Sequence, residues 1–255
     1  MNILKKVRNY YVRFKGEKGI IGFSHQNEPI FYFCVKKTQR PKIIVQYSIH
    51  AREYITSYLA LKQINDFVKN GKKGAVYFLP LVNPDGVKIA LKDGLYKANA
   101  RGVDLNVNFN ARWGRGVSNV KIAGKSDFIG ERYESEKETK ALVDFTKKVC
   151  PDITLSYHAK GEEIYYEFFQ EKRHKKRDYK IAKKLAKTTG YKIKSTIGSC
   201  GGYKDWCIDK LKIPAFTIEV APDTFIHPIK EKHINGIYEK NKNVIKVLTQ
   251  IKIKR

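Results

Sequence analysis

Four short, almost continuous apolar runs constrain the fold of this 255-residue chain more than any other feature. They are residues 42–47, 75–82, 153–157 and 215–220. Runs of this length and character predict buried strands, and helical patterns at about 55–69 and 135–149 separate them. The alternation predicts an α/β fold, and the length suits one domain spanning residues 1–255.

Three further segments complete the predicted order of elements. Residues 19–24 and 30–35 flank a polar turn and predict a hairpin at the edge of the sheet. Residues 160–169 predict a hairpin return after the strand at 153–157, and a helix at about 228–251 is expected to close the domain. Between residues 87 and 130 there is little periodicity, and a loop of this length usually carries function.

Candidate metal ligands follow two of the buried strands. His50 and Glu53 come directly after the run at 42–47, and His158 ends the run at 153–157. Open α/β sheets bind ligands at the carboxyl ends of their strands. A catalytic zinc ion takes three such nitrogen and oxygen ligands and keeps one position for water. An isolated His-x-x-Glu also arises by chance, so the interpretation depends on the rest of the chain.

Glu219 places a carboxylate inside the apolar run at 215–220. Burial of an unpaired carboxylate is costly, so the residue is interpreted as facing a catalytic cleft. There it could accept a proton from a water activated by zinc and pass it to a leaving amine. Such a reaction also needs a cation where the oxyanion develops, and Lys97 and Arg101 in the long loop are both candidates.

The chain is strongly basic, with 51 Lys and Arg against 25 Asp and Glu and a net charge of +26. This charge favours anionic partners such as nucleic acid, cell-wall polymers or acidic small substrates, although a generally lysine-rich, solvated surface explains it equally well. The most basic helix, at 172–187, lacks the interleaved aromatic residues of single-strand binders, which disfavours nucleic acid.

Compartment signals are sparse. No apolar run approaches the length of a membrane span, and charges interrupt the first 20 residues, so neither a membrane partner nor a signal peptide is expected. A cytoplasmic location is the expectation, with non-classical export to the cell wall left open. Cys34, Cys150, Cys200 and Cys207 form no Cys-x-x-Cys pair and are expected to be free thiols.

Five blocks of the sequence resemble, in order, the zinc carboxypeptidase family. They are His50–Glu53, Asn83–Gly86, Gly102–Asn106, Ser156–His158 and Thr217–Glu219, and they span about 170 residues. The resemblance implies a three-layer α/β/α fold with a mixed, twisted, eight-stranded sheet. It also implies one zinc ion per chain, bound by His50, Glu53 and His158, with Glu219 as general base and acid.

The resemblance extends to residues around the metal. Asp104 matches the aspartate that orients the first ligand histidine, and Asn106 matches the asparagine that helps to hold the substrate carboxylate. The oxyanion arginine of the family aligns with Lys97. Val107 replaces the arginine that clamps a terminal carboxylate in typical exopeptidases. The substrate-capping tyrosine falls on Ile197, and Tyr203 is the candidate to replace it.

The blocks at 97–108 and 158–165 are more similar to a bacterial branch that cleaves γ-D-glutamyl–diaminopimelate bonds in peptidoglycan peptides. Arginines near the predicted cleft would suit such anionic substrates; they are Arg52, Arg101, Arg112 and Arg115. A muropeptide peptidase is therefore the first hypothesis. A carboxypeptidase on ordinary peptides, an amidohydrolase on another acyl amino acid and a non-catalytic basic binding protein are the alternatives. The presence of all three ligands and Glu219 counts against the last. The sequence does not predict an oligomeric state.

Overall fold

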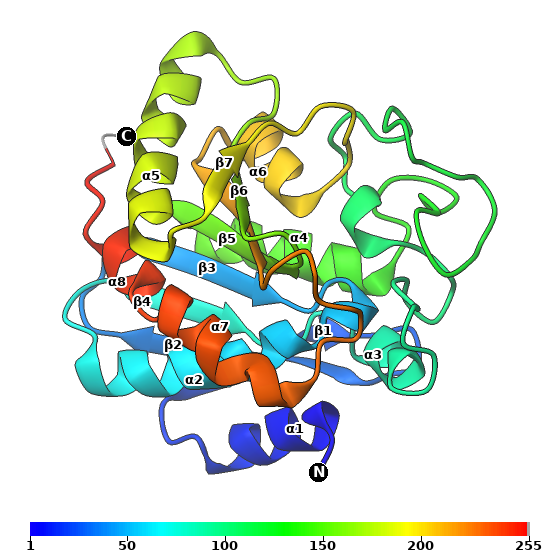
Figure 1. Cartoon of the computed structure of the whole chain (residues 1–255), viewed down its shortest axis with the longest axis horizontal. Helices are drawn as coiled ribbons and strands as arrows, with labels where there is room; N and C mark the ends of the chain where they lie inside the picture. Colours follow the sequence, from blue (N-terminus) through cyan, green and yellow to red (C-terminus); the bar gives the residue numbers. More distant parts are fainter. Residues whose placement is uncertain (254–255) are drawn as a thin grey trace.

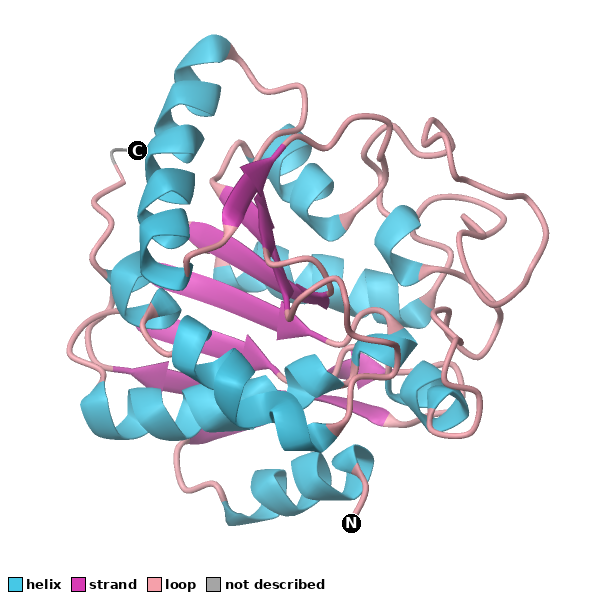
Figure 2. Cartoon of the chain, in the orientation of Figure 1, coloured by secondary structure: helices cyan, strands magenta, loops and turns pink. Residues whose placement is uncertain are grey.

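The computed structural model describes residues 1–253, and these contain one eight-stranded sheet (Figures 1 and 2). The strands are β1 (Glu17–Phe23), β2 (Pro29–Lys36), β3 (Lys42–Tyr47), β4 (Ala75–Leu79), β5 (Ile153–Ala159), β6 (Glu163–Tyr165), β7 (Lys192–Lys194) and β8 (Ala215–Val220). Their order is β1-β2-β4-β3-β5-β8-β6-β7. The central strands β4, β3, β5 and β8 are parallel, whereas β2 and β6 run antiparallel to them. The predicted mixed sheet is confirmed.

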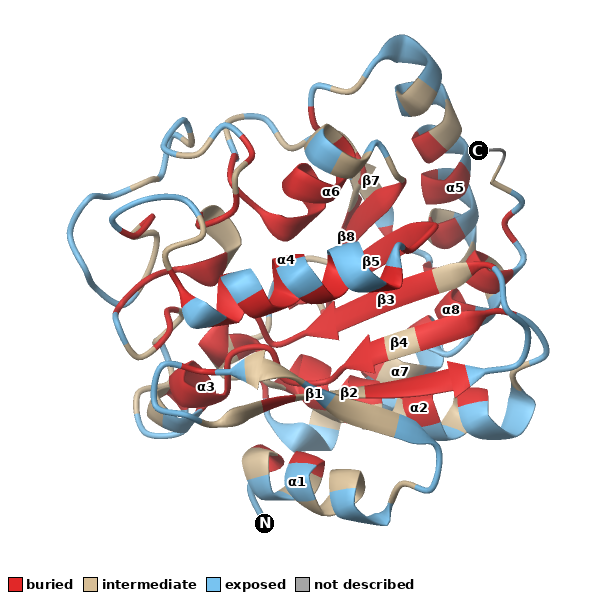
Figure 3. Ribbon diagram, turned by 180° about the vertical axis from the view of Figure 1, so that it is seen from behind, coloured by how far each residue is buried: buried red, intermediate tan, exposed pale blue. Residues whose placement is uncertain are grey.

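Helices cover both faces of the sheet. They are α1 (Ile3–Arg13), α2 (Ile55–Asn70), α3 (Pro84–Ala90), α4 (Lys137–Val149), α5 (Lys172–Thr189), α6 (Tyr203–Leu211), α7 (Ile234–Asn241) and α8 (Val244–Thr249), with 3-10 turns η1 (Ala51–Glu53), η2 (Leu105–Val107) and η3 (Glu231–His233). Figure 1 shows α2, α5, α7 and α8 over one face, and the reverse view in Figure 3 shows α4 and α6 over the other. This confirms the three-layer fold. Within residues 1–253 every helix is too short or too polar to span a bilayer.

The ends of β3 and β5 are fixed by a buried pair of tyrosines. Tyr47 and Tyr157 are direct partners in the parallel register, and their rings stack with centroids 5.1 Å apart. Gln63 of α2 satisfies both hydroxyls, accepting from Tyr47 at 2.6 Å and donating to Tyr157 at 3.0 Å. Because buried polar groups are costly unless hydrogen-bonded, this contact holds the two strand ends in register. The segments that follow these strands therefore start from defined positions.

Two local predictions are wrong. The segment expected to return beside β5 contains β6, which instead pairs antiparallel with β8. The predicted helix at about 228–251 is divided into η3, α7 and α8. Its break follows Asn241, which is buried: its carbonyl accepts a hydrogen bond from Gln63, and its amide donates to Tyr191. These tertiary contacts take precedence over continuation of the helix. The four cysteines are free, as expected.

The long segment between α3 and α4 is organised by Asn99. Its side-chain oxygen accepts the backbone N–H groups of Arg101 and Val103, and its amide donates to Glu136 at 2.8 Å. Asn99 is fully buried, so these bonds replace the solvent contacts that the side chain loses on folding. The bonds anchor the segment to the start of α4 and fix the backbone that leads into Asp104.

Glu138, in the first turn of α4, gives a pH-dependent prediction. It is fully buried, and burial raises its pKa from 4.5 to about 6. A carboxyl group with a raised pKa stabilises the folded state fully below the unfolded pKa, and this stabilisation is lost as pH rises through the folded pKa. We therefore expect Glu138→Gln to equal the wild type in unfolding free energy near pH 4 and to exceed it by about 2 kcal/mol near pH 7.5. Urea unfolding at both pH values measures this. A pH-independent difference would contradict the assignment.

Candidate metal centre

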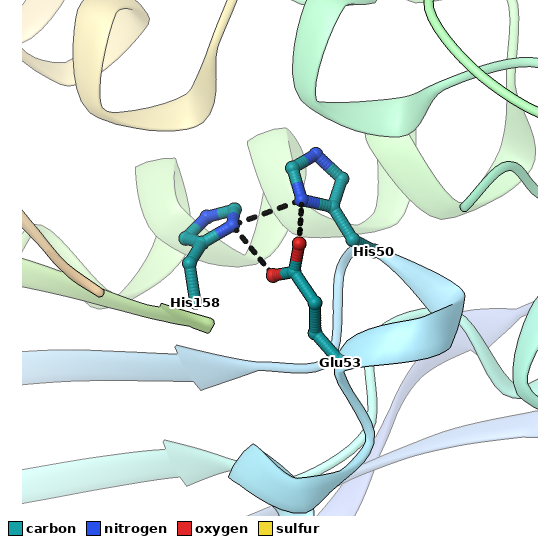
Figure 4. A group of neighbouring side chains, drawn as sticks. All are labelled: His50, Glu53 and His158. Carbon is teal, nitrogen blue, oxygen red and sulfur yellow. Dashed lines mark hydrogen bonds and ion pairs between the residues drawn. The ribbon is translucent and has the colours of Figure 1, made fainter. Parts of the chain in front are cut away.

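Three side chains from two neighbouring strands meet at the carboxyl edge of the sheet (Figure 4). His50 and Glu53 belong to the turn after β3, and His158 lies on β5. His50 Nδ1 is 2.9 Å from one Glu53 carboxylate oxygen, and His158 Nδ1 is 3.1 Å from the other. The two imidazole Nδ1 atoms are 3.0 Å apart. The backbone N–H of Ala159 also donates to Glu53, which fixes the carboxylate.

This arrangement fits a bound cation. Ligand atoms at about 2.0–2.2 Å from one zinc ion lie within roughly 3–3.5 Å of each other, as these atoms do. All three residues are buried, and a proton or a metal is required where their lone pairs face each other. Burial alone would raise the pKa of Glu53, but the adjacent His50 keeps it well below its ordinary value. The site therefore presents an ionised carboxylate and two imidazoles, a donor set that zinc favours.

Asp104 links this group to Lys97. One Asp104 carboxylate oxygen is 3.3 Å from His50 Nε2, and the other is 2.7 Å from the Lys97 ammonium. Lys97 also donates to Asp127 at 3.0 Å. Burial alone would raise the pKa of Asp104, but Lys97 and His50 keep it well below its ordinary value. The carboxylate is thus charged and placed to orient the His50 ring.

Glu219 lies beside the three ligands, on the neighbouring strand. In the register of β5 with β8, Glu219 is the partner of His158. The side chains of Glu219, His50 and His158 line one cavity. Burial, reinforced by the nearby Glu53 carboxylate, raises the pKa of Glu219 well above its ordinary value. A carboxyl group whose affinity for protons is raised in this way suits proton transfer.

The ligand group opens into a cavity of about 380 Å³. Its wall includes His50, His158 and Glu219, together with Lys97, Asn106, Asp127, Lys204 and Asp205. Asn106 accepts the backbone N–H of Tyr203 through its side-chain oxygen. Lys204 is only 5% exposed; its ammonium donates to the Glu167 carbonyl at 2.7 Å and pairs with Asp205. One cavity is therefore lined both by candidate metal ligands and by a buried ion pair.

The structure corrects two predicted site residues. Arg101 does not line the cavity, because its guanidinium group turns toward Glu131 and Glu136. The prediction that Tyr203 contacts substrate is wrong: it is fully buried, and its hydroxyl forms a 2.8 Å hydrogen bond with Thr146 of α4.

The two predicted loop arginines also lie elsewhere. Arg112 and Arg115 line a neighbouring cavity rather than the one that contains the candidate metal ligands.

Among the cavity-wall residues that sequence reasoning missed, four have a charged or phenolic side chain. They are Asp127, Tyr165, Lys204 and Asp205. Lys204 and Asp205 precede Trp206 in a helix that is too short to show a clear hydrophobic periodicity. The sequence pattern therefore does not indicate that these two charged side chains are buried. A Lys-Asp pair beside a buried tryptophan is nevertheless a useful signal, since neighbouring opposite charges can be buried together.

A His-Glu-His group at the carboxyl edge of a mixed sheet, with a further glutamate beside it, is typical of a metal-dependent hydrolase. The model of the zinc carboxypeptidase family, peptidase family M14, matches residues 16–244, and the chain belongs to this family of zinc metallopeptidases. The resemblance inferred from the five sequence blocks is thereby confirmed.

Two relatives illustrate how similar the chain is to individual members of the family. The chain is 29% identical to "Gamma-D-glutamyl-L-diamino acid endopeptidase 1" of Lysinibacillus sphaericus over 91% of its own length and 66% of that protein. It is 26% identical to carboxypeptidase B of Rattus norvegicus over 82% of its length and 59% of the relative. The chain thus spans less than two thirds of these two relatives.

Solved structures share the fold. The thrombin-activatable fibrinolysis inhibitor superposes with a TM-score of 0.82 at 22% identity, covering 96% of this chain and 71% of the other. Murein-tripeptide amidase MpaA of Escherichia coli O157 superposes with a TM-score of 0.68 at 22% identity, covering 97% of both chains.

Proposed function

We propose that this protein is a zinc-dependent peptidase that hydrolyses γ-D-glutamyl–diamino acid bonds in peptidoglycan peptides. The observation that carries the proposal is a single cavity whose wall contains both the candidate metal ligands His50 and His158 and the buried Lys204–Asp205 pair. One zinc ion per chain, held by His50, Glu53 and His158, would polarise the scissile carbonyl and lower the pKa of water.

The residues around the metal have separate roles in this proposal. Glu219 accepts the proton of the attacking water and returns it to the nitrogen as the carbon–nitrogen bond breaks, giving a carboxylate and an amine. Asp104 holds the His50 ring in place. Lys97, which lines the cavity, supplies positive charge near the developing oxyanion. Arg101, paired with Glu131 outside the cavity, has no part.

The Lys204–Asp205 pair in the cavity wall supports a diamino acid as the leaving residue. Lys204 and Asp205 place an ammonium and a carboxylate next to each other in a buried position. The side chain of diaminopimelate ends in a carboxylate and an ammonium, so each charge would find an opposite partner. Asn106 lies in the same wall and can donate to a carboxylate. The name of the Lysinibacillus relative, a gamma-D-glutamyl-L-diamino acid endopeptidase, supports the same substrate class.

A direct comparison of substrates tests this proposal. We expect zinc-loaded protein to cleave L-Ala-γ-D-Glu-diaminopimelate in preference to a hippuryl dipeptide by at least about tenfold in kcat/KM, because only the former matches both charges. Lys204→Met is expected to lose most of this preference while still cleaving the hippuryl peptide, because it leaves the metal ligands intact. Preference of the wild type for the hippuryl peptide would favour an ordinary carboxypeptidase, and cleavage of neither peptide would favour a non-catalytic binding protein.

A further inference from the structure

A second cavity lies next to the first, across one short segment of chain. Its lining is Arg112, Trp113, Arg115, Phe169 and the segment 198–200. Gly198, Ser199 and Cys200 also line the catalytic cavity, so this segment is the shared wall between the two. Cys200 of this wall is close in sequence to Gly202 and Lys204, which also line the catalytic cavity. The second cavity is therefore a candidate site for the part of a substrate that extends beyond the leaving residue.

The two arginines of this second cavity are positioned by local structure. A backbone hydrogen bond from Arg115 to the Arg112 carbonyl closes a turn that brings them together. The Arg112 guanidinium carbon lies 3.5 Å from the centre of the Phe169 ring, a cation–π contact that fixes the charge. The Val117 N–H donates to the Gly198 carbonyl at 2.9 Å and ties the arginine loop to the shared wall. Both arginines are exposed, so their guanidinium groups are accessible to a ligand that enters this cavity.

The cationic side chains of the two cavities differ in whether they already have a carboxylate partner. The lysines of the catalytic cavity both have carboxylate partners, Asp104 and Asp127 for Lys97 and Asp205 for Lys204. Within residues 1–253, neither Arg112 nor Arg115 forms an ion pair. Free guanidinium groups bind carboxylates through two parallel hydrogen bonds. A further substrate carboxylate therefore finds its available cations in the second cavity.

We propose that this second cavity binds the terminal carboxylate of a substrate with one more residue after the leaving diamino acid. The inference rests on the proposed function and specifies its substrate: a peptide that continues past the leaving diamino acid, rather than one that ends with it. Trp113 and Phe169 supply an apolar wall for a small side chain at this extra position. Val107, in the catalytic cavity, offers no charge to hold the carboxylate closer to the metal.

Equilibrium binding tests the inference without turnover. In zinc-loaded Glu219→Gln protein, calorimetry would compare L-Ala-γ-D-Glu-diaminopimelyl-D-Ala with its C-terminal amide. We expect the acid to bind about tenfold more tightly than the amide, the strength of a charge-assisted pair that is partly exposed. Arg112→Ala and Arg115→Ala should each remove most of this difference and leave the amide unaffected. Arg13→Ala, an exposed arginine on α1, is the matched control and should retain the difference.

The possible results distinguish failure of this binding site from failure of the proposed reaction. Equal binding of acid and amide, an equal loss for both peptides in the arginine variants, or no binding of either peptide would overturn the inference. If the wild type cleaves no muropeptide but the carboxylate preference still depends on Arg112 and Arg115, the proposed reaction fails and the binding site stands. If muropeptides are cleaved without any carboxylate preference, the reaction stands and the site fails.

Discussion

Glu219→Gln is expected to reduce hydrolysis by about 10³-fold or more while zinc stays bound, because the change removes the group that transfers the proton and no metal ligand. The amide is nearly isosteric with the carboxyl group, so the neighbouring strand contacts of β8 remain. Initial rates on the muropeptide, with zinc content measured by elemental analysis on the same preparation, test both halves of this expectation.

The control for this experiment is Glu163→Gln. Glu163 is the register partner of Glu219 on β6 and accepts a hydrogen bond from Tyr165, but it does not line the catalytic cavity. It should retain activity within a few-fold of the wild type. Near-wild-type hydrolysis by Glu219→Gln would reject Glu219 as the base, and a loss of zinc in that variant would show that its role is structural.

His158→Ala is expected to abolish stoichiometric zinc binding and, with it, hydrolysis. The change removes one of three ligands from a buried site, and loss of even an outer hydrogen-bond partner typically weakens metal binding by about 10–100-fold. Zinc titration with a competing chelator, alongside activity assays, measures the effect. The wild type should bind one equivalent per chain.

His174→Ala provides the comparison for this variant. His174 lies on the basic helix α5, away from the ligand group, so both zinc stoichiometry and rate should match those of the wild type. Retention of one tightly bound zinc by His158→Ala would exclude His158 as a ligand. A folded apo form is expected for the variant, since β5 is held in register by the Tyr47–Tyr157 contact, and circular dichroism would verify it.

The sheet and the three candidate ligands were accessible from sequence for a common physical reason. Strands buried on both faces are apolar along their whole length, so the residues at which they end can be located from the sequence. His50, Glu53 and His158 stand at such ends, and the parallel register brings the ends together. Glu219 was equally visible, because a carboxylate interrupts an otherwise apolar strand.

The rest of the site depends on where side chains point, which periodicity does not specify in loops and short helices. Tyr203 and Lys204 are neighbours in α6, yet Tyr203 faces α4 and Lys204 faces the cavity. Arg101 and Lys97 are four residues apart in a loop without regular structure. Ion pairs with Asp104 for Lys97 and with Glu131 for Arg101 direct the two side chains differently. The C-terminal helix was mispredicted for a similar reason. Gln63, which is far away in the sequence, donates a hydrogen bond to the Asn241 carbonyl, and the helix breaks after that residue.

The wall shared by the two cavities has a consequence for how this scaffold can diversify. The candidate metal ligands depend on β3 and β5, in the middle of the sheet, whereas the wall and the arginine turn are surface segments joined by few backbone bonds. Insertions and substitutions accumulate most readily in surface segments. With the role proposed for the second cavity, substitutions within residues 112–117 and 198–200 would be enough to change the preference between a short and a long leaving group, while the residues that carry out the chemistry stay the same.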